Sequence, residues 1–191
     1  MQTQTDTFNE SETTTRARLR LFSLYVDFAA AVRARRVTSQ ISRMAGDHWK
    51  SSSEMWNLDS LTASEPIRKM MTRDAADADV LVVAMSSLDR RELELVQWLD
   101  AVAACRVNRP APGLFIGLLG DENSRAEELD WTVKEFLRCA RQMDRDFIWH
   151  WMEESAIDGN DWLPEILEGL LTRKQPAPDA TFLSDAILGT A

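Results

Sequence analysis

Acidic and hydroxyl side chains follow three of the short apolar runs in this sequence, and their chemistry could form a site. Carboxylate oxygens can hold Mg²⁺ or act as general bases. Asp and Ser directly after a strand are also preferred caps of the following helix, so both interpretations apply. The candidates, with one aromatic neighbour, are Asp27, Phe28, Ser86, Ser87, Asp89, Asp121 and Glu122.

The motifs that cradle a phosphate or activate a nucleophile are missing from the sequence. There is no GxGxxG and no GxxxxGK[ST], and the segment 27–31 contains no glycine through which backbone amides could approach a phosphate. No GxSxG elbow is present either. The two histidines and two cysteines are not spaced as metal ligands, so no metal site is predicted beyond Mg²⁺ on the carboxylates. We expect Cys105 and Cys139 to be buried free thiols.

Five short runs of strand character alternate with helical patterns, at 19–26, 48–58, 80–85, 114–119 and 147–152. This alternation predicts a mostly parallel sheet with helices on both faces. The run 80–85 is apolar throughout, as in a central strand, whereas the serines at 51–53 suit an edge strand. We therefore predict a three-layer α/β sandwich with the flavodoxin-like strand order 2-1-3-4-5, and leave the direction of the fifth strand open.

In this strand order, ligands bind where the first and third strands end. Asp27 and Phe28 follow the first of these strands, and Ser86 and Ser87 follow the third. The predicted site is therefore the rim between these two strand ends.

The chain is predicted to hold one domain between two tails. Residues 1–17 are rich in Thr, Gln and Glu, which is typical of a disordered tail. Residues 18–174 carry the five strands and their helices, a usual size for one domain. Residues 175–191 hold two prolines and then a short apolar segment that could dock on the domain or on a partner.

Net charge and hydropathy exclude several classes of partner. The net charge of −9 and the pI of about 4.8 argue against general nucleic-acid binding, which needs a basic surface. No apolar stretch is long enough to span a membrane and no signal sequence is recognised, so we expect a cytoplasmic protein. Aromatic or apolar side chains predicted outside the core are candidates for a protein interface or a homodimer. They are Trp98, Trp131, Phe182 and Ile187.

In the order of its elements, the segment 19–152 resembles the receiver domains of response regulators. Asp27 matches one of the acids that receivers place after their first strand. Receivers have a phosphoacceptor aspartate where this chain has Met85 and Ser86, a Ser or Thr where it has Gly120, and a lysine where it has Trp151. The resemblance implies a flavodoxin-like fold that does not accept a phosphoryl group on aspartate.

Two further resemblances are carried by short patterns. The segment 76–83, an Ala-Asp repeat followed by a strand, resembles the nucleoside deoxyribosyltransferase and TIR-like group, which uses a carboxylate nucleophile. The segments 56–59 and 78–80 resemble a small bacterial family that brings no function with it. The leading hypothesis is a non-catalytic, receiver-like module that works through protein contacts. The alternative is a nucleoside- or nucleotide-type enzyme with an acidic, Mg²⁺-binding rim.

Overall fold

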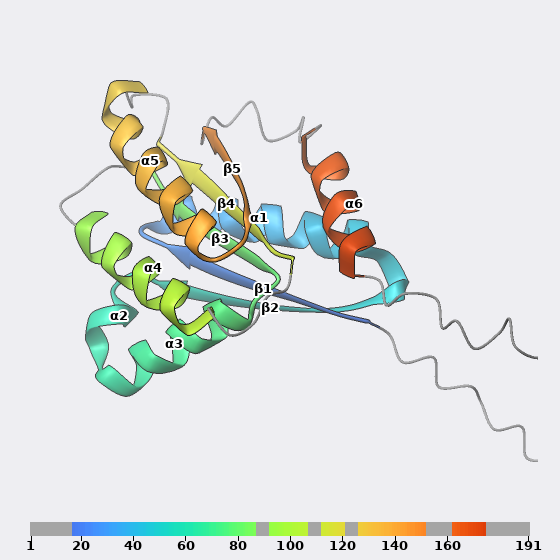
Figure 1. Cartoon of the computed structure of the whole chain (residues 1–191), viewed down its shortest axis with the longest axis horizontal. Coiled ribbons are helices and arrows are strands. Elements are labelled where there is room, and N and C mark those ends of the chain that lie inside the picture. Colours follow the sequence, from blue (N-terminus) through green and yellow to red (C-terminus); the bar gives the residue numbers. More distant parts are fainter. Residues whose placement is uncertain (1–16, 87–91, 107–111, 121–125, 152–161, 175–191) are drawn as a thin grey trace, which may run out of the picture.

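The computed structural model describes residues 17–86, 92–106, 112–120, 126–151 and 162–174 (Figure 1). The predicted tails lie outside these residues, apart from Ala17, which begins the first strand. The chain order is β1 (Ala17–Tyr25), α1 (Phe28–Ala45), a 3-10 turn (Gly46–His48), β2 (Trp49–Asn57), α2 (Ser60–Ala63), α3 (Glu65–Asp77), β3 (Val80–Met85), α4 (Glu92–Arg106), β4 (Leu114–Leu119), α5 (Ala126–Gln142), β5 (Asp146–Trp151) and α6 (Trp162–Lys174).

The five strands form one parallel sheet in the order β2-β1-β3-β4-β5. The predicted fold class and strand order are therefore confirmed. β5 is parallel to β4, with Leu114 opposite Asp146 and Leu119 opposite Trp151. Every residue of β3 and β4 is buried, because helices cover both faces of these central strands.

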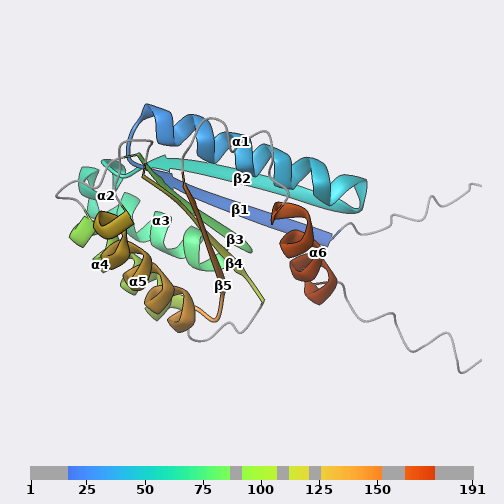
Figure 2. The same cartoon turned by 90° about the horizontal axis from the view of Figure 1, so that it is seen from above.

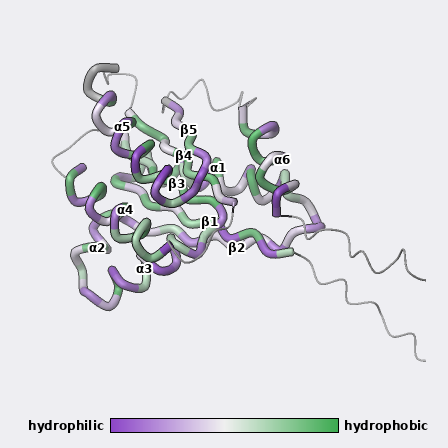
Figure 3. Tube along the Cα trace, viewed as in Figure 1, coloured by the Kyte–Doolittle hydropathy of each residue, from purple (hydrophilic) through white to green (hydrophobic). Residues whose placement is uncertain are grey.

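Helices lie on both sides of the sheet, which gives three layers (Figure 2). One apolar cluster joins α1 and α6 to one face, and the other joins α2, α3, α4 and α5 to the opposite face. Alternate residues of β1 supply the two clusters, with Leu21 on the first side and Phe22 on the second. Hydrophobic residues follow the strands through the centre, while hydrophilic residues mark the outer turns of the helices (Figure 3).

Local sequence signals determine where α1 and α5 end. The Asp27 side chain caps α1, and Gly46 ends it with a φ of 66°, a conformation that glycine adopts without steric cost. Asp144 has a φ of 52° after α5, and the Arg145 amide donates to the Ala140 carbonyl at 3.0 Å. This bond is typical of a Schellman ending, in which glycine usually takes the left-handed position.

The edge strand β2 is polar, as the serine run indicates. Residues 50–54 are exposed, and β2 pairs with β1 on one side only. Charged and hydroxyl side chains on an edge strand discourage pairing with the edge of another sheet. None of the helices in the described part of the chain has the length and apolarity to cross a membrane.

Candidate functional site

Asp27 and Ser86 meet at the carboxyl ends of β1 and β3, at the predicted rim. The Val26 amide donates to the Ala84 carbonyl at 3.1 Å, which brings the two strand ends together. Asp27 Oδ1 accepts from the Ala30 amide at 2.9 Å. Asp27 Oδ2 accepts from the Ser86 amide at 3.3 Å and from the Ser86 hydroxyl. The carboxylate therefore links the start of α1 to the end of β3.

The hydrogen bonds around Asp27 decide its protonation. Burial alone would raise the pKa of this carboxyl, but the bonds from Ser86 and from the first amides of α1 outweigh burial and hold the pKa below its usual value. The N-terminal end of the helix dipole also favours a negative charge. Asp27 is thus ionised at neutral pH with hydrogen bonds on both oxygens. Such a group anchors a helix well and is a weak general base at neutral pH.

Phe28 lies beside this anchor and is exposed over 83% of its surface. Ser87, Asp89, Asp121 and Glu122 lie outside the described residues, so their geometry relative to Asp27 stays a prediction. Across the described residues, no group of three or more histidine, cysteine or acidic side chains is arranged to hold a metal ion.

The two predicted interface tryptophans differ in exposure. Trp131 is exposed over 45% of its surface, whereas the expectation that Trp98 lies on the surface is wrong, since only 4% of it is exposed. Trp98 Nε1 donates to Thr72 Oγ1 at 3.1 Å, and its ring stacks on Phe22 with centroids 5.9 Å apart. Because α4 packs between α3 and α5, residues on a wide part of its circumference are buried, and Trp98 is one of them. Phe182 and Ile187 lie outside the described residues.

The two cysteines also differ from each other. Cys139 is buried, as expected, and burial raises the pKa of its thiol to about 12. The expectation for Cys105 is wrong, because this thiol is exposed near the end of α4. Reagents in solution can therefore reach the Cys105 thiol, whereas Cys139 is both buried and protonated at neutral pH.

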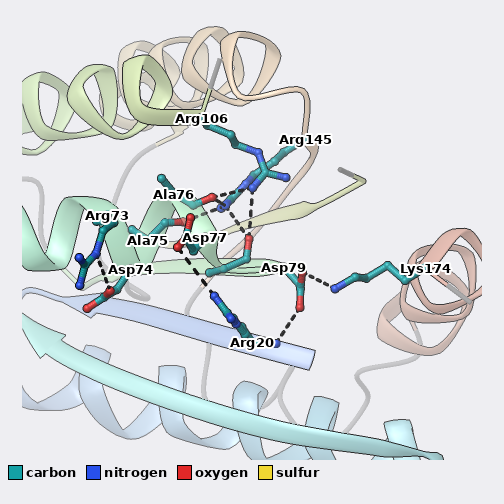
Figure 4. Close-up of polar contacts among 11 residues, drawn as sticks. Arg20, Arg73, Asp74, Ala75, Ala76, Asp77, Asp79, Arg106, Arg145 and Lys174 are labelled. Carbon is teal, nitrogen blue, oxygen red and sulfur yellow. Dashed lines mark hydrogen bonds and ion pairs between the residues drawn. The ribbon is translucent and has the colours of Figure 1, made fainter. Parts of the chain in front are cut away.

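A second polar cluster, which the sequence did not predict, lies at the opposite ends of the strands from Asp27, where α3 ends and β3 begins (Figure 4). Arg106 and Arg145 are 5% and 6% exposed. Arg106 donates to the Ala76 carbonyl at 2.7 Å, and Arg145 donates to the carbonyls of Ala75 at 2.8 Å and Ala78 at 2.7 Å. The two guanidinium groups thus satisfy the last carbonyls of α3.

Burial lowers the pKa of both guanidinium groups. For Arg145, burial and the neighbouring Arg106 charge lower the pKa to about 9, so the group is still protonated at neutral pH. The sequence indicates this cluster only weakly. Arg106 ends one helical pattern and Arg145 follows another, and arginines near a helix C-terminus often donate to its last carbonyls.

Asp79, at the same ends of the strands, links β1 to α6. Its Oδ2 atom accepts from the Arg20 amide at 2.7 Å, and its Oδ1 atom pairs with Lys174 (Figure 4). Lys174 also donates to the Arg18 carbonyl at 3.4 Å. The end of α6 is therefore held beside the starts of β1 and β3.

Comparison of the chain with models of known protein families gives no match, and comparison with curated proteins gives none either. The geometry of its own residues is therefore the basis for a functional proposal.

Proposed function

We propose that this chain is a non-catalytic, receiver-like module that acts through protein–protein contacts. The observation that carries the proposal is Phe28, a large aromatic side chain exposed over 83% of its surface on the first turn of α1. Val32, one turn further along α1, is 42% exposed, and residues four apart share one helix face. Exposed aromatic side chains of this kind often supply the binding energy of an interface.

The position of Phe28 is fixed by the anchor beside it. Asp27 caps α1 and is tied to β3 through Ser86, so the first turn of the helix is held to the sheet. A side chain on a fixed helix loses little conformational freedom on binding, which favours affinity. We therefore place the partner-binding surface, defined by Phe28 and Val32, at the start of α1.

The chemistry at the end of β3 supports a role without phosphoryl transfer. Met85 and Ser86 stand where a receiver has its phosphoacceptor aspartate. Asp27, the acid after β1, accepts three hydrogen bonds, so most of its roughly four lone-pair sites are already used before any Mg²⁺ could bind. This arrangement favours the binding module over an enzyme with a metal-binding rim.

The test compares two substitutions at opposite ends of α1. Phe28→Glu places a charge on the proposed surface, and Met44→Glu places the same charge on a residue that is 37% exposed. Proteins retained by the immobilised chain are purified and titrated by calorimetry. A hot-spot loss of about 2 kcal/mol, or roughly thirtyfold in Kd, is expected for Phe28→Glu alone.

Two results contradict the proposal. Equal affinity of both variants for every confirmed partner, including a second copy of the chain, removes Phe28 from the interface. Turnover of a nucleoside or phosphate substrate that is lost in Asp27→Asn shows that the module is an enzyme.

A further inference from the structure

A groove of about 400 Å³ runs between α3 and α4, and Phe28 is not among its lining residues. Leu61 and Ala101 contribute apolar surface, Arg68 and Lys69 contribute positive charge, and Glu94 contributes a negative charge from α4. Lys69 also pairs with Glu65 at 2.7 Å. Cys105 lines the groove from the last turn of α4. The groove therefore combines apolar contact area with basic side chains from α3.

Trp98 gives this groove a fixed apolar wall. Its indole N–H is already bonded to Thr72 Oγ1, and its ring is backed by Phe22. The edge of the ring that remains in the groove therefore needs no polar partner. A fixed indole beside aliphatic side chains suits an amphipathic segment that inserts apolar residues.

We propose that the segment 181–188 of this same chain docks in the groove between α3 and α4. Phe182, Leu183, Ala186 and Ile187 recur at helical spacing and define one apolar face, while Leu188 falls on the opposite face. This face matches an amphipathic ligand that enters a groove with aromatic and aliphatic anchors.

The place where α6 ends brings this segment within reach of the groove. Lys174 pairs with Asp79, two residues after the end of α3. The neighbouring residue of Cys105, Arg106, bonds to the Ala76 carbonyl at the same end of α3. The end of the groove that Cys105 lines therefore lies near the amino ends of the strands, where α6 also ends.

The connecting chain is long enough to reach the groove. Seven residues, 175–181, separate α6 from Phe182 and include two prolines, and in an extended proline-rich conformation they span about 22 Å. Thr72, the residue of the groove nearest the end of α3, lies about 8 Å from that end at a rise of 1.5 Å per residue. The segment can therefore pass from the α6 side of the sheet into the groove.

Both terminal segments are acidic, and the apolar face distinguishes the C-terminal segment from the N-terminal one. Residues 175–191 contain Asp179 and Asp185 and no basic residue, opposite Arg68 and Lys69 on the groove. Residues 1–16 contain a single aromatic residue, Phe8, among polar side chains. Of the two terminal segments, the C-terminal one therefore offers the apolar face that the groove can accept.

The exposed Cys105 thiol reports whether the groove is covered. The full-length chain and its Ile187→Asp and Leu188→Asp variants are treated with a chromogenic disulfide reagent, and a Cys105→Ser variant supplies the blank. Buried Cys139, with its raised pKa, does not contribute under native conditions. If the segment is docked for about 90% of the time, Ile187→Asp raises the rate about tenfold. Leu188→Asp, its neighbour on the other face, leaves the rate within about twofold.

Equal rates in the full-length chain and the Ile187→Asp variant overturn the proposal, whether the thiol reacts quickly or slowly. A cross-link distinguishes docking within one chain from docking between copies. Under a mild oxidant, Ala186→Cys forms a disulfide with Cys105 that migrates as a monomer, and Ser184→Cys on the opposite face does not. A dimeric product, or no product from Ala186→Cys, rejects docking of the segment on its own domain. The result does not depend on the Phe28 surface, so each proposal can fail alone.

Discussion

The guanidinium groups of Arg106 and Arg145 share the carbonyl oxygen of Ala78 as an acceptor, at 3.4 Å and 2.7 Å. One arginine ends α4 and the other follows α5, so the two meet over the end of a third helix, α3. Two like charges are held together in a buried position because the carbonyls at a helix C-terminus carry partial negative charge. This contact fastens three helices on one face of the sheet.

Replacement of Arg145 by methionine is expected to destabilise the fold. The substitution removes the charged donor of the Ala75 and Ala78 carbonyls, and a hydrogen bond to a charged group contributes about 1.5–3 kcal/mol. Arg141→Met, on an exposed turn of α5, should change the free energy of unfolding by less than about 0.5 kcal/mol. Urea denaturation measures both, and equal stabilities would show that the arginine pair does not support α3.

Asp27 should make stability depend on pH on the acid side. Because its folded pKa lies below its usual value, the folded chain holds this proton less tightly than the unfolded chain. The stabilisation is present above the ordinary carboxyl pKa of 3.8 and is lost as the pH falls through the folded value. Asp27→Asn retains a capping side chain but should lack this contribution. Parallel melting curves from pH 7 to pH 2.5 are the measurement, and an identical acid dependence in both proteins would contradict it.

Asp144 offers a stabilising substitution. Its φ of 52° costs an L-residue free energy that glycine does not lose, so Asp144→Gly should raise the unfolding free energy by about 0.5–1 kcal/mol. Asp144→Val, which is branched at Cβ, should lower it. A thermal melt in which glycine is less stable than aspartate would indicate that the Asp144 side chain makes a compensating contact.

Cys139 should react with a thiol reagent only after unfolding. Burial removes it from solvent and raises its pKa to about 12, which leaves very little thiolate at pH 8. Mass spectrometry after alkylation should find Cys105 modified in the native protein and both cysteines modified in denaturant. Native modification of Cys139 at a rate near that of Cys105 would mean that α5 opens locally.

The strand order could be predicted because the polarity of a strand indicates whether it lies at the edge or in the centre of the sheet. The serines at 51–53 mark an edge, and the uninterrupted apolar run at 80–85 marks the centre. Asp27 was predicted as a cap from its place before a helical pattern, and its side chain does cap α1. These features depend on neighbours in the sequence, so local patterns contain them.

Other features depend on contacts between distant segments and could not be derived in this way. Trp98 is buried because α3 approaches α4 closely enough for Thr72 to accept its N–H. The Arg106–Arg145 contact needs the ends of three helices in one place, which no single pattern encodes. The short helix α2 has only four residues, too few for helical periodicity to appear.

The contact between Lys174 and the Arg18 carbonyl places the last turn of α6 against the second residue of β1. Circular permutation is most readily tolerated where the ends of a fold are adjacent. A permuted chain could be closed through the residues that flank 17–174 and opened in the exposed turn at 46–48. Such a chain would begin with the edge strand β2. Its β1 segment, which lies between β2 and β3 in the sheet, would be synthesised after β5 and α6. During synthesis the sheet would therefore lack the strand beside β3 until β1 emerged, and the fold would have to insert this interior strand after the other four.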